Sequence, residues 1–386
     1  MTEKPLRPLA LFTPLPSATE PSATEPSATE PSSAEPSSAE PSSAASRNGP
    51  PGDRPRSRRA LRLLCLTEMV AVMPYLALKV HWVTGGTTGL GDGALADAPA
   101  FFWLNMLTVG LAVGALGVGV FLAGSRSLRA PAWPLLLPTW VGTGLLVPVV
   151  LAAPVAGLVL LLGADGGGEA QAAGSGSAPL VQPWVFGVVY TGFTVQGLAL
   201  VAALALWVRA RWGGALAEPV GNRASAPGPG AVARAVAAAA SATVLAAAVP
   251  HGLWAAGTKV PLFERDAFPF GVGVRLTEGV HVLAAVCAVL GLWALLRPAG
   301  RRVRTGTAMT AAWIGTGVLF TGAGWMLLTS VVGPGRAGDV LRAPTPVELL
   351  WAVQMAAAVL IAAVAVRAFA VTAGGRPPAG TARAGG

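Results

Sequence analysis

The chain has few charged residues. Of its 386 residues only 12% are charged, whereas 53% are hydrophobic. The surface of a soluble domain carries a much larger share of charged residues, so this composition excludes an ordinary soluble protein. The net charge is +9, with 24 Arg and 3 Lys. In a soluble protein such an excess favours nucleic-acid binding. Here membrane topology explains it, and no nucleic-acid partner is predicted.

The residues on which common enzymes depend are scarce. Lys4, Lys79 and Lys259 follow Glu, Leu and Thr, so the chain has no Gly-Lys pair and no phosphate-binding P-loop. The three histidines are isolated, which excludes an HExxH zinc helix, and no serine lies in G-x-S-x-G. Cys65 and Cys287 lack metal-ligand spacing, and we do not expect them to form a disulfide. The sequence therefore predicts no catalytic motif and no cofactor.

What the chain has instead is a series of apolar blocks. Blocks of about twenty residues are long enough to cross the hydrocarbon core of a bilayer as helices. They do not alternate with a period of two, which excludes a β-barrel. We therefore predict an all-α, polytopic transmembrane bundle surrounded by a lipid bilayer. The eight predicted spans are 61–83, 101–124, 135–163, 184–208, 232–257, 277–297, 308–332 and 346–371.

Two sequence patterns each occur twice, once in each half of the chain. Trp140–Leu146 (WVGTGLL) and Trp313–Leu319 (WIGTGVL) agree at five of seven positions. Gln196 and Gln354 each follow a valine and each precede an arginine by thirteen residues. The offset between the halves is 173–176 residues for the first three pairs of spans and 158 for the fourth. We predict two tandem four-helix repeats that cross the membrane in the same sense, as in parallel-repeat transporters.

The segment before the first span has a different composition. Residues 16–45 are six pentads of the type PSATE, which lack the large apolar groups that a packed core needs. No apolar segment typical of a cleavable signal peptide occurs before residue 60. The predicted organisation is a disordered cytoplasmic tail (1–59), a first four-span repeat (60–212), a cytoplasmic linker (213–230), a second four-span repeat (231–371) and a disordered cytoplasmic tail (372–386).

Basic residues indicate the orientation. If the N-terminus is cytoplasmic, both termini and the loops after spans two, four and six hold 21 of the 27 basic residues, and the opposite loops hold five. This asymmetry predicts a bacterial plasma-membrane protein with both termini in the cytoplasm. The cluster before span one fits that topology, and its alternative role is binding of anionic lipids. It consists of Arg54, Arg56, Arg58, Arg59 and Arg62.

Span one carries three polar residues on one face. Glu68, Tyr75 and Lys79 fall within about 40° of one another on a helix. Glu68 and Lys79 are about 16 Å apart along the axis, so each requires another partner. The three form a candidate stripe along a proton or substrate path, because ionisable groups in a span are costly. In the alternative, Lys79 snorkels outward and Glu68 reaches a neighbouring helix or the inner surface.

All three histidines lie near predicted outer ends of spans. His81 is in span one, His251 in span five and His281 in span six, with Glu278 one turn before His281. Imidazole and carboxylate groups bind zinc or copper. If these three spans meet, the four residues form a metal site at the outer face. The alternative is that the histidines are ordinary polar ends of helices.

The two glutamines form a pair related by the predicted repeat. Gln196 and Gln354 are expected either to hydrogen-bond across helices or to face a shared central cavity. Asn105 in span two has no evident counterpart in span six, and we expect it to be structural.

The strings Pro74–Gly86 (PYLALKVHWVTGG) and Trp140–Gly144 resemble those of uncharacterised multi-pass actinobacterial membrane proteins. The resemblance covers the spans and implies a bacterial plasma membrane without implying an activity. Three functional hypotheses remain open. The first is a transporter-like or channel-like protein with a path between the two repeats. The second is a non-transporting scaffold or regulator whose disordered tail binds partners. The third is an intramembrane enzyme that uses the outer His and Glu residues.

Overall fold

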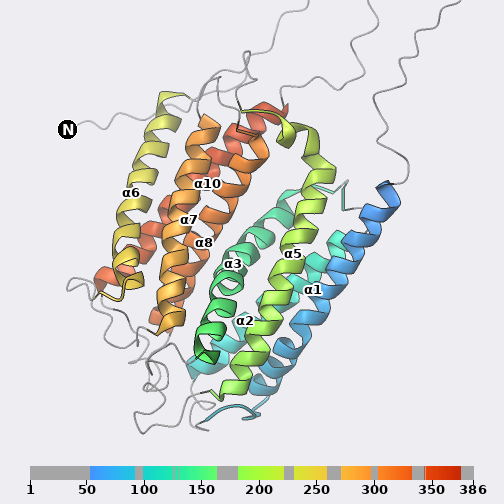
Figure 1. The fold of residues 1–386 in the computed structure, drawn as a ribbon, viewed down its shortest axis with the longest axis vertical. Coiled ribbons are helices and arrows are strands. Elements are labelled where there is room, and N and C mark those ends of the chain that lie inside the picture. Colours follow the sequence, from blue (N-terminus) through green and yellow to red (C-terminus); the bar gives the residue numbers. More distant parts are fainter. Residues whose placement is uncertain are drawn as a thin grey trace, which may run out of the picture. The chain divides into compact units, whose positions relative to one another are not determined.

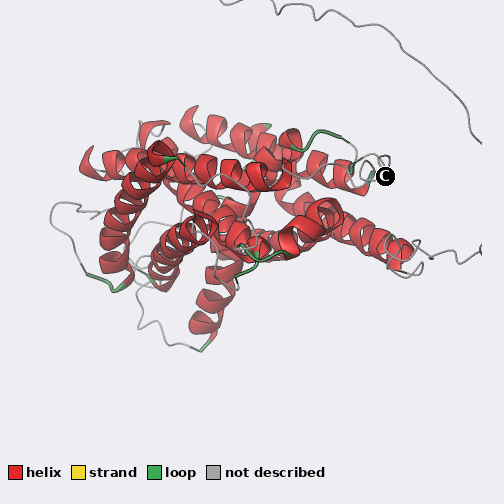
Figure 2. Ribbon diagram, turned by 90° about the horizontal axis from the view of Figure 1, so that it is seen from above, coloured by secondary structure: helices red, strands yellow, loops and turns green. Residues whose placement is uncertain are grey.

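Over the residues that it describes, the computed structural model consists almost entirely of helices (Figures 1 and 2). It describes residues 53–91, 99–124, 127–128, 130–162, 181–220, 230–258, 271–296, 303–332, 343 and 345–374. Each helix is long and apolar enough to cross a membrane. The predicted all-α, eight-span membrane bundle is thereby confirmed. The helices are α1 (Asp53–Val83), α2 (Pro99–Ala123), α3 (Trp133–Leu161), α5 (Pro183–Ala217), α6 (Ala231–Ala255), α7 (Val272–Leu296), α8 (Thr305–Val332) and α10 (Thr345–Gly374).

Two helices extend furthest beyond the apolar blocks that predict them. α1 begins at Asp53, and α5 continues to Ala217, past the start of the predicted linker. The end of α5 is held by Arg211, whose Nη1 donates to the carbonyls of Leu128 (2.9 Å) and Ala130 (2.8 Å). An apolar block marks only the part of a helix that can lie in lipid, so it misses such polar extensions. Most of the predicted tails and linker (residues 1–52, 221–229 and 375–386) lies outside the described residues.

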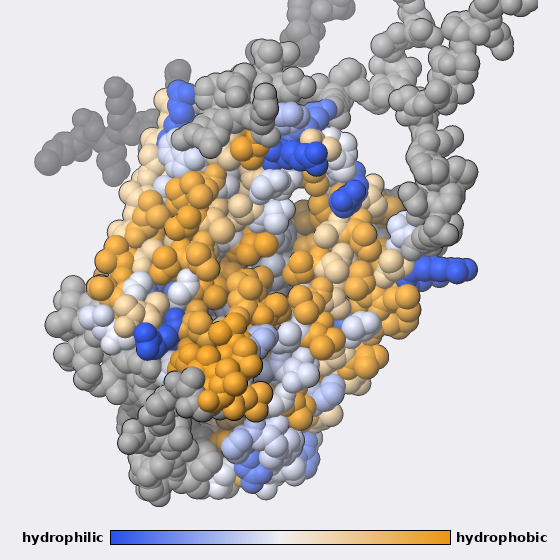
Figure 3. Space-filling view, viewed as in Figure 1, coloured by the Kyte–Doolittle hydropathy of each residue, from blue (hydrophilic) through white to orange (hydrophobic). Residues whose placement is uncertain are grey.

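The sides of the bundle are apolar. Large side chains such as Val70, Leu198 and Leu290 are more than half exposed. On the face drawn in Figure 3 hydrophobic residues cover much of the helices, and the most hydrophilic ones lie mainly toward the helix ends. Contiguous apolar surface of this kind is unfavourable in water and favourable in lipid. The surface therefore fits a multi-pass membrane protein.

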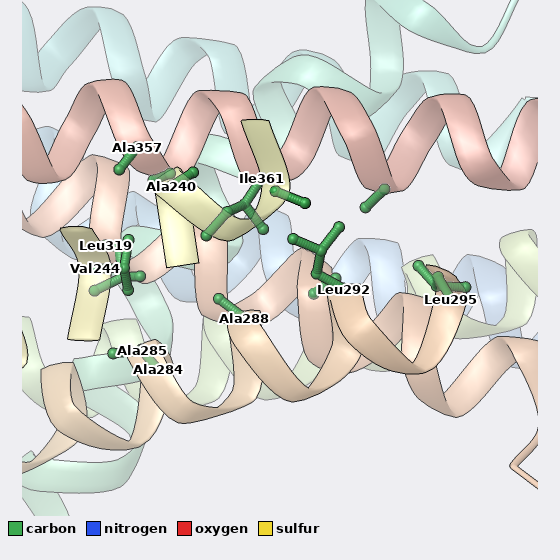
Figure 4. Close-up of a cluster of buried hydrophobic side chains, with 14 of the residues drawn as sticks. Ala240, Val244, Ala284, Ala285, Ala288, Leu292, Leu295, Leu319, Ala357 and Ile361 are labelled. Carbon is green, nitrogen blue, oxygen red and sulfur yellow. The ribbon is translucent and has the colours of Figure 1, made fainter. Parts of the chain in front are cut away.

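The largest buried cluster is made mainly of small residues. Figure 4 shows Ala284, Ala285 and Ala288 of α7 facing Ala240 and Val244 of α6. Small side chains let helices approach closely, which matters in lipid because packing there replaces the hydrophobic effect between helices. This cluster joins α6, α7, α8 and α10, the last contributing Ala357 and Ile361.

The helix contacts have the same pattern in both halves of the chain. When α1, α2, α3 and α5 are matched in order with α6, α7, α8 and α10, the same five pairs pack together in each set. In the first set these pairs are α1–α2, α1–α5, α2–α3, α2–α5 and α3–α5, and in the second α6–α7, α6–α10, α7–α8, α7–α10 and α8–α10. The halves meet where α3 packs against α8 and α7, and α5 against α8.

The two repeated strings face each other at the α3–α8 contact. Trp140 Nε1 donates to Thr316 Oγ1 at 3.2 Å, and the Trp140 ring stacks on Phe320 with centroids 4.9 Å apart. A Cβ atom on Gly144 would collide with the backbone of Gly317. The glycines of the two strings thus allow the halves to approach at backbone distance.

Candidate functional site

Three of the predicted metal-ligand candidates lie together. His251 of α6 and Glu278 and His281 of α7 each offer one ligand atom, and these atoms lie within 4.8 Å of one another. All three side chains are buried. Polar groups are rarely buried among apolar helices without a specific set of partners. We call these three residues the His–Glu–His cluster.

The positions of the residues on their helices explain why they meet. His251 is four residues before the end of α6, and Glu278 is six residues after the start of α7. Because α6 and α7 follow each other and pack together, the end of one meets the beginning of the other. His281 lies one turn after Glu278, on the same face. Arg275 Nε donates to the Ala255 carbonyl at 3.0 Å and joins the two helix ends.

The hydrogen bonds of His251 show that its Nε2 carries a proton. Gln354 Nε2 donates to the Leu319 carbonyl at 3.1 Å, so its Oε1 is the atom that faces His251 Nε2, at 2.9 Å. An amide oxygen only accepts, and His251 Nε2 therefore donates. His251 Nδ1 lies 2.5 Å from Glu278 Oε2. One proton lies between these two atoms, because a carboxylate oxygen and a bare imidazole nitrogen both accept.

His281 is oriented by the backbone of its own helix. Its Nδ1 donates to the Thr277 carbonyl at 2.9 Å, which in the neutral ring leaves the lone pair on Nε2. A Cβ atom on Gly322 of α8 would collide with His281 Nε2, so glycine makes room for the ring. The His281 ring stacks on His251 with centroids 4.9 Å apart and planes 9° from parallel.

This arrangement fits a transition-metal site. A histidine that binds a metal usually donates its other ring N–H to an oxygen, as both histidines do here. In the neutral rings these hydrogen bonds leave His251 Nδ1 and His281 Nε2, together with the Glu278 carboxylate, as the groups able to bind a cation. Two imidazoles and one carboxylate suit Zn²⁺ and related cations. Zinc with four ligands at about 2.0 Å would require ligand atoms about 3.3 Å apart, so the 2.5 Å between His251 Nδ1 and Glu278 Oε2 would have to widen on binding.

His81 does not join the cluster. Its side chain is exposed, and its Nε2 lies 3.0 Å from Thr88 Oγ1. It belongs to α1, which packs against α2 and α5. Of the four predicted residues, the structure therefore brings three together. The position of a residue near a helix end indicates how deep it lies in the membrane, but it does not show which helices pack against each other.

Glu68 and Gln196 form a second buried polar pair. Gln196 Nε2 of α5 donates to Glu68 Oε1 of α1 at 3.3 Å. Each glutamine thus hydrogen-bonds across helices inside its own half, Gln196 to α1 and Gln354 to α6 and α8. The sequence did not identify this pair, because their positions do not show that α1 and α5 are neighbours.

Lys79 has its own set of partners. Its Nζ donates to Asn105 Oδ1 at 2.6 Å and lies 5.4 Å from the Tyr75 ring centroid and 4.7 Å from the Trp82 ring centroid. The Tyr75 hydroxyl in turn hydrogen-bonds to Thr108 of α2. Of the three predicted stripe residues, Tyr75 and Lys79 therefore contact each other and α2, whereas Glu68 contacts Gln196 of α5.

The polar residues of the first half correspond in position to those of the second. At offsets of 176 residues for α1 and α6, 173 for α2 and α7, and 158 for α5 and α10, buried polar residues coincide. At the 173-residue offset Asn105 of α2 falls at Glu278 of α7. The corresponding pairs are Tyr75 and His251, Asn105 and Glu278, Thr108 and His281, and Gln196 and Gln354.

Fold and site together define a multi-pass helical membrane protein with a buried polar cluster in each half. Comparisons with protein-family models, with curated proteins and with solved structures give no match to this chain. Its function is therefore inferred from its own residues.

Proposed function

We propose that this protein is a transporter-like protein of the bacterial plasma membrane that binds a transition-metal cation, Zn²⁺ or copper. The binding site is the His–Glu–His cluster of the second half. The observation that carries this proposal is the convergence of three ligand atoms within 4.8 Å in a buried position. The hydrogen bonds of both histidines to oxygen acceptors support it.

The proposal includes two tandem repeats of four helices. The five equivalent helix pairs in each half support it, as do buried residues at fixed offsets such as Thr143 and Thr316. Two halves that cross the membrane in the same sense are one architecture of secondary transporters.

The surroundings of Lys79 in the first half support the proposal that the His–Glu–His cluster of the second half binds a cation. Its ammonium group contacts Asn105 and Tyr75, whose counterparts in the second half are Glu278 and His251. The first half thus holds a tethered cation at the place where the second half presents metal-binding groups. The counterpart of Lys79 itself is Ala255, which has no charge. A free cation bound in the second half would take the corresponding place.

The position of α8 connects the cluster with the contact between the halves. Gly322 and Leu319 of α8 border the cluster, and Gly317 of the same helix meets Gly144 of α3. A shift of one half against the other at this contact would move one wall of the site. This supports a path between the two repeats that is linked to cation binding.

An intramembrane enzyme is the second candidate. Two histidines and one carboxylate leave a fourth position for water, as in catalytic zinc sites. The scaffold hypothesis depends on the tail at residues 1–59, most of which lies outside the described residues.

Binding is tested by calorimetric titration of the full-length protein in lipid nanodiscs with Zn²⁺. We expect one equivalent to bind, and His251→Ala or His281→Ala to abolish binding. His81→Ala is the matched control, because His81 is exposed and outside the cluster. The proposal would be contradicted if the wild-type protein did not bind Zn²⁺, or if His81→Ala lost Zn²⁺ binding as the cluster variants do.

Transport is tested with liposomes that enclose a zinc-sensitive dye. The reconstituted wild-type protein should admit Zn²⁺ faster than His251→Ala and as fast as His81→Ala. Binding without uptake would reject the transporter and favour the enzyme.

Topology and lipid contacts belong to the same proposal. Arg58, Arg59 and Arg62 are found near the start of α1, and the side chains of Arg58 and Arg59 are exposed, which favours contact with anionic lipids of the cytoplasmic leaflet. Reporter fusions should place both termini in the cytoplasm. A fusion pair on opposite sides would contradict the eight-span account.

A further inference from the structure

The Glu68–Gln196 pair lacks one hydrogen-bond donor. Both side chains are almost fully buried, at 1% and 3% exposure. Gln196 Nε2 donates to Glu68 Oε1, but Glu68 Oε2 and Gln196 Oε1 have no partner among the described residues. Two unsatisfied acceptors on adjacent groups are costly in a buried site.

A single proton on Glu68 Oε2 removes both deficits. The carboxylic acid then donates its O–H to Gln196 Oε1 while its carbonyl oxygen accepts from Gln196 Nε2. The protonated form is also neutral, which avoids the cost of a charge within a membrane span.

The surroundings of Glu68 favour the neutral form. Gly119 of α2 lies against its Oε2, Gln196 reaches it from α5, and on its own helix the Cys65 thiol lies one turn away. None of these three groups carries a positive charge. Lys79 lies about 16 Å further along α1, and its ammonium is engaged by Asn105.

We propose that Glu68, with Gln196 as its acceptor, is a proton-binding site of the first half, and that its proton is the coupling ion of the transporter. The coupling role rests on the proposed function, whereas the proton site does not. Release of the proton requires water to reach the carboxylate, so it would accompany separation of α1 from α5.

Infrared spectroscopy of the full-length protein in lipid tests the protonation. At neutral pH the spectrum should contain the deuterium-sensitive C=O stretch of a carboxylic acid, and Glu68→Gln should remove it. The variant should fold, because its amide can still donate to Gln196 Oε1. Glu348→Gln is the control, since Glu348 accepts from Ser330 Oγ and should leave the band unchanged. A band that survives in Glu68→Gln would overturn the proposal.

Labelling with dicyclohexylcarbodiimide gives a second test on the unaltered chain. A buried carboxylic acid adds across this carbodiimide, and peptide mapping by mass spectrometry should find the reagent on Glu68. Labelling should fall about tenfold per pH unit once most of Glu68 is ionised. No label at neutral pH, or protection by Na⁺ at constant pH, would overturn the proton assignment. The second of these results would indicate a sodium site.

Zinc-driven proton movement separates this proposal from the proposed function. Glu68→Gln should bind Zn²⁺ as the wild type does and lose proton counterflow in liposomes. If the wild type shows the Glu68 band but binds no Zn²⁺, the metal proposal fails and the proton site stands. If Zn²⁺ uptake proceeds without any Glu68 band, the proton site fails.

Discussion

At the residue scale, the histidines of the cluster are held by residues outside the cluster. Gln354 is fully buried and holds His251 through an amide oxygen whose orientation the Leu319 carbonyl fixes. Such outer partners set the tautomer of a ligand histidine and raise its basicity.

Replacing Gln354 by Leu should therefore lower the affinity for Zn²⁺ by about 10–100-fold, because His251 Nε2 loses its acceptor. Competition with a chromophoric chelator measures the affinity. Gln196→Leu is the matched control in the other half and should leave zinc affinity unchanged. An equal loss in both variants would mean that Gln354 acts only through stability.

The sequence predicted the members of this cluster better than their contacts. His251, Glu278 and His281 could be placed at helix ends from the apolar blocks alone, but His81 could be placed there equally well. The choice among them depends on which helices pack together, and burial in lipid leaves no amphipathic signal that shows this. Extending the 173-residue offset of the WxGTG strings into span six pairs Asn105 with Glu278.

At the element scale, the account depends on close contact between α3 and α8. Apolar side chains gain little by leaving lipid, so association of helices depends on tight packing and on hydrogen bonds. At this contact Gly144 allows the tight packing, and Thr316 accepts a hydrogen bond from Trp140.

Gly144→Ala should destabilise the protein by about 1–3 kcal/mol, because the new Cβ collides with backbone atoms of Gly317. Gly157→Ala on the same helix has open space around its Cβ and should change stability by less than about 0.5 kcal/mol. Unfolding in mixed micelles measures both free energies. Equal stabilities would show that the α3–α8 contact can relax.

The apolar blocks predicted which elements exist but not where they end. α1 begins at Asp53 and α5 runs to Ala217, beyond the segments that lipid requires to be apolar. Arg211 at the end of α5 finds its acceptors 81 and 83 residues away in the chain, so that extension depends on a long-range contact.

At the scale of the whole molecule, the two halves carry different polar groups at corresponding places. The first half has a tethered ammonium group and the Glu68–Gln196 pair, and the second has the His–Glu–His cluster. Under the two proposals above, the first half would bind a proton and the second a metal cation.

The correspondence between the halves predicts that a metal site can be built into the first half. The variant combines the changes Tyr75→His, Lys79→Ala, Asn105→Glu and Thr108→His. It should bind two equivalents of Zn²⁺ instead of one, as measured by calorimetry and by metal analysis after gel filtration. The native site serves as an internal control for folding, and one equivalent only would argue against the correspondence.

The most direct measurement is zinc X-ray absorption on the full-length protein in nanodiscs with one equivalent of Zn²⁺. The account predicts a first shell with two imidazole nitrogens and carboxylate oxygen at about 2.0 Å. It also predicts loss of the imidazole scattering in the His251→Ala, His281→Ala double variant. A wild-type spectrum without imidazole scattering, or one that the double variant leaves unchanged, would contradict it.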